Sequence, residues 1–182
     1  MTDSLFDLAH AVRFDLASGS VRAQGQEDRL VLLPAKALEN LLLYASAESG
    51  VALGKALGES IGKRVAARIG ATGAPSVDDF ATALAGEAAV AGIGVVSFER
   101  WGRALVVVIE HSALPVPLLA PVVGAALEAA SGRTVYSALL AHEGHSVRVL
   151  VASPSGIDRV RGWIASGISW GDALVKLQGG GS

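Results

Sequence analysis

The run His142-Glu143-Gly144-His145 places two imidazoles and one carboxylate in a single short segment. Two histidines and a carboxylate form a ligand set that zinc and iron accept, usually when rigid elements hold the ligands. Three ligands crowded into one tight turn converge poorly on one ion, and polar loop residues are usually solvated. The spacing therefore predicts a solvated turn, with His142, Glu143 and His145 as candidate metal ligands and no bound cofactor.

A second polar run, Glu110-His111-Ser112, contains the residue types of a hydrolase. A nucleophile needs a base within hydrogen-bond reach and a third group that orients the base. Neighbouring residues of a strand point to opposite faces, so Glu110 and His111 cannot simply pair. The chain also has no Gly-x-Ser-x-Gly motif to present a serine. We expect a strand end here and assign no catalytic residue.

The glycines of Gly92-Ile93-Gly94 do not form a phosphate-binding loop. The third glycine of a dinucleotide-binding motif is missing, and the run leads from a helix into a strand. Phosphate binding needs the reverse order, in which a strand leads into a helix N-terminus. This pattern therefore predicts no nucleotide cofactor.

Two regions contain residues that are common in protein contacts. Trp101 and Arg103 lie at the tip of an expected hairpin, and both residue types are enriched at interfaces. The alternative is a solvated turn with Trp101 partly buried. Near the C-terminus, Trp170, Leu174 and Leu177 have the i, i+4, i+7 spacing of a helix face that docks in a groove. Packing back onto the same domain is the more ordinary outcome.

Composition limits the classes of protein to which the chain can belong. Its 182 residues are 51% hydrophobic and 18% charged, which predicts a folded chain and excludes disorder for its bulk. A net charge of −2 gives no electrostatic attraction to nucleic acid or anionic membranes, and the absence of cysteine excludes disulfides and thiolate metal sites. The acidic start lacks a signal peptide, and the longest uncharged stretch, residues 112–127, is too short to span a membrane. We expect a cytoplasmic protein.

Apolar spacing and turn residues predict the elements that must position these groups. We expect strands at 21–24, 29–33, 95–100, 104–110, 133–141 and 146–152, and helices at 34–69, 76–92, 118–130 and 154–167. This order predicts an α+β fold, with an antiparallel sheet of two or three hairpins and helices packed on one face. The whole of 1–178 is expected to be one domain, followed by a flexible Gly-rich tail at 179–182.

The first long helix contains a row of glycines at every fourth position: Gly50, Gly54, Gly58 and Gly62. Each glycine inside a helix costs roughly 1 kcal/mol relative to alanine, so close packing must recover the loss. Rows at i±4 suit a partner helix that crosses at an angle. The partner is either the second helix or the sheet of the same chain, or another subunit.

The strand Leu105–Ile109 is apolar without alternation, so both of its faces need cover. Helices are expected on one face. A loop, the N-terminal hairpin, a bound apolar molecule or a second subunit must cover the other. An uncovered face would promote aggregation, so the pattern predicts a homo-oligomer, with Val106 and Val108 as candidate interface residues.

The glycine-spaced helix, followed by Ser76-Val77-Asp78-Asp79-Phe80 and Ala91-Gly92-Ile93-Gly94, resembles the 4-vinyl-reductase-type domain and its relatives among TRAPP small subunits. Leu119-Ala120-Pro121-Val122-Val123-Gly124 with Ser131-Gly132-Arg133 resembles the D-type subunit of bacterial cellulose synthase. The similarity covers about Ser46 to Ala152 and implies an antiparallel sheet with helices on one side, and dimers or larger assemblies. Some 4-vinyl-reductase-type domains bind small apolar or aromatic molecules, sometimes beside a cysteine-rich zinc site, and TRAPP relatives hold an acyl chain on cysteine. Without cysteine, neither the zinc site nor the acyl attachment transfers to this chain.

These observations favour a non-catalytic, homo-oligomeric assembly or scaffold module and leave enzymatic activity undecided. The alternative is a sensor domain that binds a small apolar molecule between sheet and helices. A third hypothesis is an accessory subunit of an exopolysaccharide (cellulose-type) synthase. The expected partners are a second copy of the chain, a small apolar ligand or other protein subunits, with no nucleic acid and no transmembrane segment.

Overall fold

The computed structural model describes residues 10–24, 26–27, 29–70, 76–102 and 104–179. Its elements follow in chain order: β1 (Val12–Asp15), β2 (Ser20–Ala23), β3 (Arg29–Leu30), α1 (Ala35–Leu43), α2 (Ala47–Gly70), α3 (Val77–Val90), β4 (Val95–Trp101), β5 (Ala104–Glu110), α4 (Val116–Ser131), β6 (Ser137–Glu143), β7 (Ser146–Val151), α5 (Pro154–Ala165) and α6 (Trp170–Gly179). No helix among these residues combines the length and the apolar character that crossing a bilayer requires.

The strands form two antiparallel sheets, one in the order β1-β2-β3 and one in the order β4-β5-β7-β6. The predicted α+β class with antiparallel hairpins is therefore confirmed. In the larger sheet β5 is central: Val107 pairs with Phe98 of β4 on one side and with Val149 of β7 on the other. Gly102 and Gly144, in the two hairpin turns, both have positive φ, which a residue without a Cβ adopts readily.

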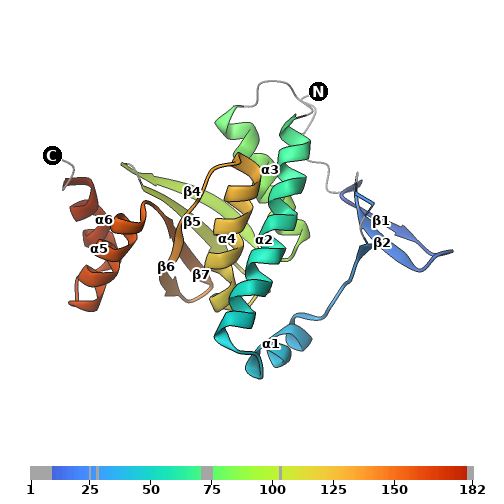
Figure 1. The fold of residues 1–182 in the computed structure, drawn as a ribbon, viewed down its shortest axis with the longest axis horizontal. Helices are drawn as coiled ribbons and strands as arrows, with labels where there is room; N and C mark the ends of the chain where they lie inside the picture. The colour runs from blue at the N-terminus through green and yellow to red at the C-terminus, as the bar shows by residue number, and fades with distance from the viewer. Residues whose placement is uncertain (1–9, 25, 28, 71–75, 103, 180–182) are drawn as a thin grey trace.

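Helices cover both faces of the larger sheet, rather than the one face that the sequence predicts. Helices α2, α3 and α4 pack on one face, and α5 and α6 pack on the other (Figure 1). Side chains of β5 alternate between the two cores, with Val107 and Ile109 in the first and Val106 and Val108 in the second. The difference arises because the apolar C-terminal segment folds as α6 and supplies the second cover from within the chain.

The glycine row of α2 faces α4 of the same chain. A methyl group on Gly58 would overlap the carbonyl oxygen of Val122, and one on Gly62 would lie 2.7 Å from the Cβ of Ala129. Gly54 is equally restricted, because Pro121 would lie 2.9 Å from its added Cβ, whereas Gly50 has only ordinary contacts. The two backbones therefore touch, and the partner is α4 rather than the second helix or the sheet.

The helix predicted over 34–69 is in fact two helices, α1 and α2, separated at residues 44–46. Ser46 accepts a hydrogen bond at Oγ from the backbone N–H of Ser49 at 3.1 Å, which caps the start of α2. The start predicted at Ser76 is correct, since Ser76 and Asp79 form a reciprocal capping box. The backbone hydrogen bond that Ser76 donates to Asp79 lowers the pKa of that carboxyl.

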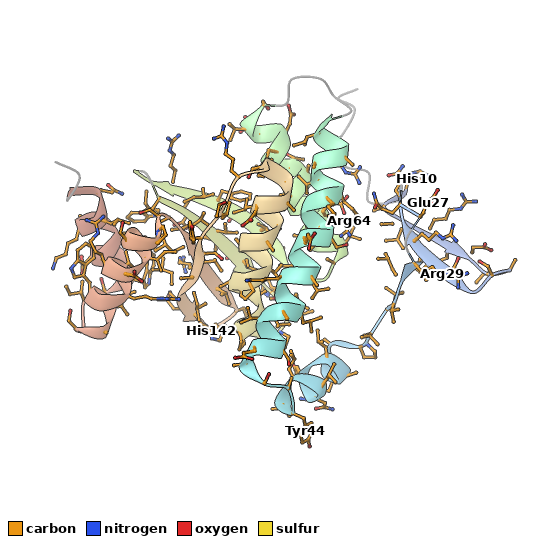
Figure 2. All side chains as sticks on the ribbon, in the orientation of Figure 1. His10, Glu27, Arg29, Tyr44, Arg64 and His142 are labelled. Atoms are coloured by element: carbon orange, nitrogen blue, oxygen red, sulfur yellow. The ribbon has the colours of Figure 1, made fainter. Side chains whose placement is uncertain are left out.

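The described part of residues 10–44 forms what we call the N-terminal arm. Its strands lie apart from the main body, and its helix α1 lies at the end of α2 (Figure 1), where Leu38 and Leu42 pack on the main core. Its strands pack extensively only on one another, and α1 has no fully buried residue. Many of its other large apolar side chains are exposed: Phe14, Leu16, Val31, Leu32, Leu33, Leu41, Leu43 and Tyr44. Leu16 is 94% exposed and Tyr44 92%, and Figure 2 shows Tyr44 pointing away from the protein.

Candidate functional site

A small cavity of about 20 Å³ lies where α2, α3 and α4 meet the larger sheet. Nine residues line it: Ile61, Leu84, Ala88, Ile93, Val96, Val107, Val122, Val123 and Ala126. Helices α2 and α4, which approach closely along the glycine row, form part of the cavity wall. Helix α3, the loop before β4 and the sheet form the rest. Every lining side chain is apolar, so the cavity has the character of a hydrophobic binding site without a catalytic group.

A buried ionic network lies next to this cavity. Glu87 of α3 accepts hydrogen bonds from Arg64 Nε at 2.6 Å and from Arg68 Nη2 at 2.7 Å, and Arg64 also donates to Ser60 Oγ at 2.9 Å. Arg64 and Glu87 are buried, and Glu87 stands between the cavity residues Leu84 and Ala88 in the sequence of α3. The network therefore fastens α3 to α2 beside the cavity.

The network of Glu87 with Arg64 and Arg68 is absent from the expectations drawn from the sequence. The usable signal was Glu87, the one charged residue in the otherwise uncharged stretch 80–90. A carboxylate buried in such a helix needs a cation, and two arginines four residues apart on a neighbouring helix provide one.

The three candidate metal ligands of the 142–145 run point toward different partners. Glu143 accepts a hydrogen bond from Trp170 Nε1 at 2.9 Å and lies 3.6 Å from Arg148 Nη1, whereas His145 stacks on His111 with ring centroids 5.5 Å apart. His142 is exposed at the end of β6 (Figure 2). Within the part of the chain that the structure describes, no three His, Cys, Asp or Glu residues are arranged to hold an ion.

The Glu110-His111-Ser112 run lies at the end of β5, where a strand end was expected. His111 has a φ of +54°, and its backbone N–H donates to the carbonyl of His145 at 3.0 Å. Gly94 has a φ of +120°, and a Cβ there would overlap the carbonyl oxygen of Glu110. This glycine therefore serves the close packing of the α3–β4 loop on the end of β5.

The half-buried Trp101 packs beneath α6. Its ring meets that of Trp170 edge to face at 6.3 Å, and its Nε1 donates to Glu99 at 3.0 Å. The guanidinium of Arg148 lies 4.7 Å from the centre of the Trp170 ring. Leu174 and Leu177 join the same core, so the C-terminal apolar segment packs on its own sheet. Arg103, the other residue predicted at this hairpin tip, lies outside the described residues.

A second hollow, of about 830 Å³, is lined by residues of the N-terminal sheet and its flanks, including Val12, Phe14 and Ala23. It is far larger than the cavity in the main body, but it is an open surface on a small sheet that packs extensively only on itself. It is therefore a surface hollow, in contrast to the cavity that the buried core residues line.

No family model matches this chain, and no curated protein is similar to it. A solved structure with a similar fold is a sensory domain of a transcription activator. It is the phenol-responsive sensory domain of PoxR, solved with phenol, and it is 20% identical to this chain with a TM-score of 0.63. The similarity covers 83% of this chain and 89% of that domain. At this identity the similarity shows a shared fold.

Proposed function

We propose that this chain is a sensory domain that binds a small apolar molecule in the cavity between α2, α3, α4 and the sheet. The observation that carries the proposal is the cavity itself, buried in the main core and lined only by apolar side chains. The fold shared with the phenol-responsive domain supports it. The expected 4-vinyl-reductase-type identity fits this neighbour and stays a prediction, as does a cytoplasmic location. Neither the scaffold role nor the synthase-subunit role gains support.

The cavity must enlarge to admit a ligand of aromatic size. Its volume of about 20 Å³ holds little more than a water molecule, whereas an apolar cavity of roughly 150 Å³ binds benzene. A ligand that binds only the folded form raises the melting temperature, and a larger preformed cavity binds it with less rearrangement.

Replacing Leu84 with alanine tests the location of the site. We expect Leu84→Ala to lower the free energy of unfolding by about 2–5 kcal/mol, because it removes a buried side chain from the cavity wall. Toluene at saturation should then raise the melting temperature of this variant more than that of the wild type. Thermal unfolding followed by circular dichroism, with and without toluene, measures both effects.

The matched control is Leu174→Ala. Leu174 is fully buried on the other face of the sheet, so the same truncation opens a space that does not add to the existing cavity, and the response to toluene should be smaller. An equal response in both variants would show that the truncation creates the binding space, and it would contradict the location proposed for the site. No response in the wild type or in Leu84→Ala would contradict the proposed function.

A second property, self-association, is favoured by the N-terminal arm. A three-stranded sheet this small is marginally stable by itself, and its exposed apolar side chains find no cover in the main body. We propose that a second copy of the chain covers the arm. The interface would then be the arm, in place of Val106 and Val108, which α5 and α6 already cover.

We expect the wild type to be dimeric in size-exclusion chromatography with light scattering, and the triple variant Val31→Ser/Leu32→Ser/Leu33→Ser to be monomeric. The control is Val77→Ser/Val95→Ser/Val175→Ser, which changes side chains of similar exposure outside the arm and should stay dimeric. A wild type that is monomeric over the whole concentration range, or a control that dissociates equally, would refute the role of the arm.

A further inference from the structure

We infer that the cavity selects small hydrocarbons that carry no hydrogen-bonding group, and that it discriminates against their hydroxylated counterparts. This inference rests on the proposed function and narrows it, because it names the chemical class of the ligand. A sensory domain with the same fold can respond to phenol, as the domain of PoxR does. The walls of the cavity in this chain predict a different preference.

The first argument is the chemistry of the walls. Valine, isoleucine, leucine and alanine supply all nine lining side chains, and none of them carries a donor or an acceptor. The elements around the cavity also satisfy their own backbone groups, since they are helices and paired strands. A hydroxyl group that enters this space loses its hydrogen bonds to water and finds no replacement.

The second argument is that Glu87, the carboxylate that follows the cavity residue Leu84 and precedes Ala88 in α3, already has partners. Both carboxylate oxygens of Glu87 accept hydrogen bonds from arginines, at 2.6 and 2.7 Å. A ligand hydroxyl that donates to Glu87 would have to displace one of these bonds.

The expected ratio of the two dissociation constants follows from the cost of leaving the phenol hydroxyl without a hydrogen bond. An unsatisfied buried hydroxyl lowers affinity by about tenfold to a hundredfold. We therefore expect toluene to bind the wild type at least about tenfold more tightly than phenol, although the two molecules are similar in size. Isothermal titration of the full chain with each compound measures the ratio of dissociation constants.

One strand offers a matched pair of variants that separates the cavity from general hydrophobicity. Val107→Thr introduces a hydroxyl of nearly the same shape into the cavity wall, where it can pair with the hydroxyl of phenol. Val106→Thr introduces the same group on the opposite face of β5, where the side chain is equally buried but lies in the second core. Val107→Thr should lower the preference for toluene by about fivefold, and Val106→Thr should leave it at the wild-type value.

Val96→Thr is the second variant, because Val96 also lines the cavity but is half-buried on β4, where a hydroxyl disturbs the fold less. The shift in preference should appear in both cavity variants. Equal affinity of the wild type for toluene and phenol would overturn the inference and leave the sensory function intact. An unchanged ratio in both cavity variants would also overturn it, and failure of both compounds to bind would refute the proposed function as well.

Discussion

Gly58→Ala is expected to lower the free energy of unfolding by about 3 kcal/mol, although alanine is the better helix former. The added methyl group would overlap the carbonyl oxygen of Val122, and it meets backbone rather than a flexible side chain. Relief of that overlap requires α2 and α4 to separate, which disturbs the seam along which they pack. The gain in helix propensity, about 1 kcal/mol, does not offset the loss.

Chemical denaturation of Gly58→Ala and of a matched control checks this prediction. Gly162→Ala is the control, because Gly162 lies inside α5 with open space where its Cβ would stand. It should raise the free energy of unfolding by about 0.5–1 kcal/mol through helix propensity and reduced freedom of the unfolded chain. A Gly58→Ala variant as stable as the wild type would contradict the backbone contact between α2 and α4.

Glu87→Gln is expected to have a comparable effect for an electrostatic reason. The substitution keeps the shape of the side chain but leaves two arginines, one of them buried, without their counter-charge. Breaking a buried ion pair by removal of one partner costs about 3–5 kcal/mol. We therefore expect a large loss of stability, measured by urea denaturation followed by circular dichroism.

Glu59→Gln is the matched control for this charge. Glu59 lies 2.8 Å from Lys63 on the exposed side of α2, and this pair lowers the pKa of the Glu59 carboxyl. Exposed pairs contribute little to stability, so the change should be small beside that of Glu87→Gln. Replacing the two most buried partners, as in Arg64→Met/Glu87→Leu, should recover part of the loss, because it removes the buried charge of Arg64 and leaves only that of Arg68, whose side chain is partly exposed. Equal effects of Glu87→Gln and Glu59→Gln would contradict the buried network.

Local signals in the sequence predict much of the fold. Helix α3 is predicted by the capping box at Ser76, and the two hairpins are predicted by the turn glycines at 102 and 144 and by the apolar runs that flank them. These features depend on residues that are close together in the chain. The break between α1 and α2 escaped prediction because the apolar residues of 38–45 continue the helical pattern past it. The helices on the second face of the sheet were not predicted, because that packing depends on where α6 docks after the helix has formed.

The candidate site was harder to predict than the elements that form it. Its walls come from α2, α3, α4, β4, β5 and the loop before β4, and each lining residue alone is an ordinary core residue. The sequence analysis considered residues with reactive side chains as candidate ligands. The structure places two of them, His142 and His145, at an exposed turn away from the cavity lining. A cavity arises where many packed side chains together leave a small volume unfilled, and no local sequence pattern predicts it.

The glycine row also determines where the main core can yield. The backbones of α2 and α4 are in contact, so a change of side-chain rotamer cannot make room between them. Separating the two helices would lose their van der Waals contacts and leave a void. Helix α3 has no such seam; it is held at one side by Glu87 and its arginines and at its end by a loop with two positive-φ glycines. If this core expands, we expect α3 to tilt outward and the hydrogen bonds of Glu87 to limit that movement.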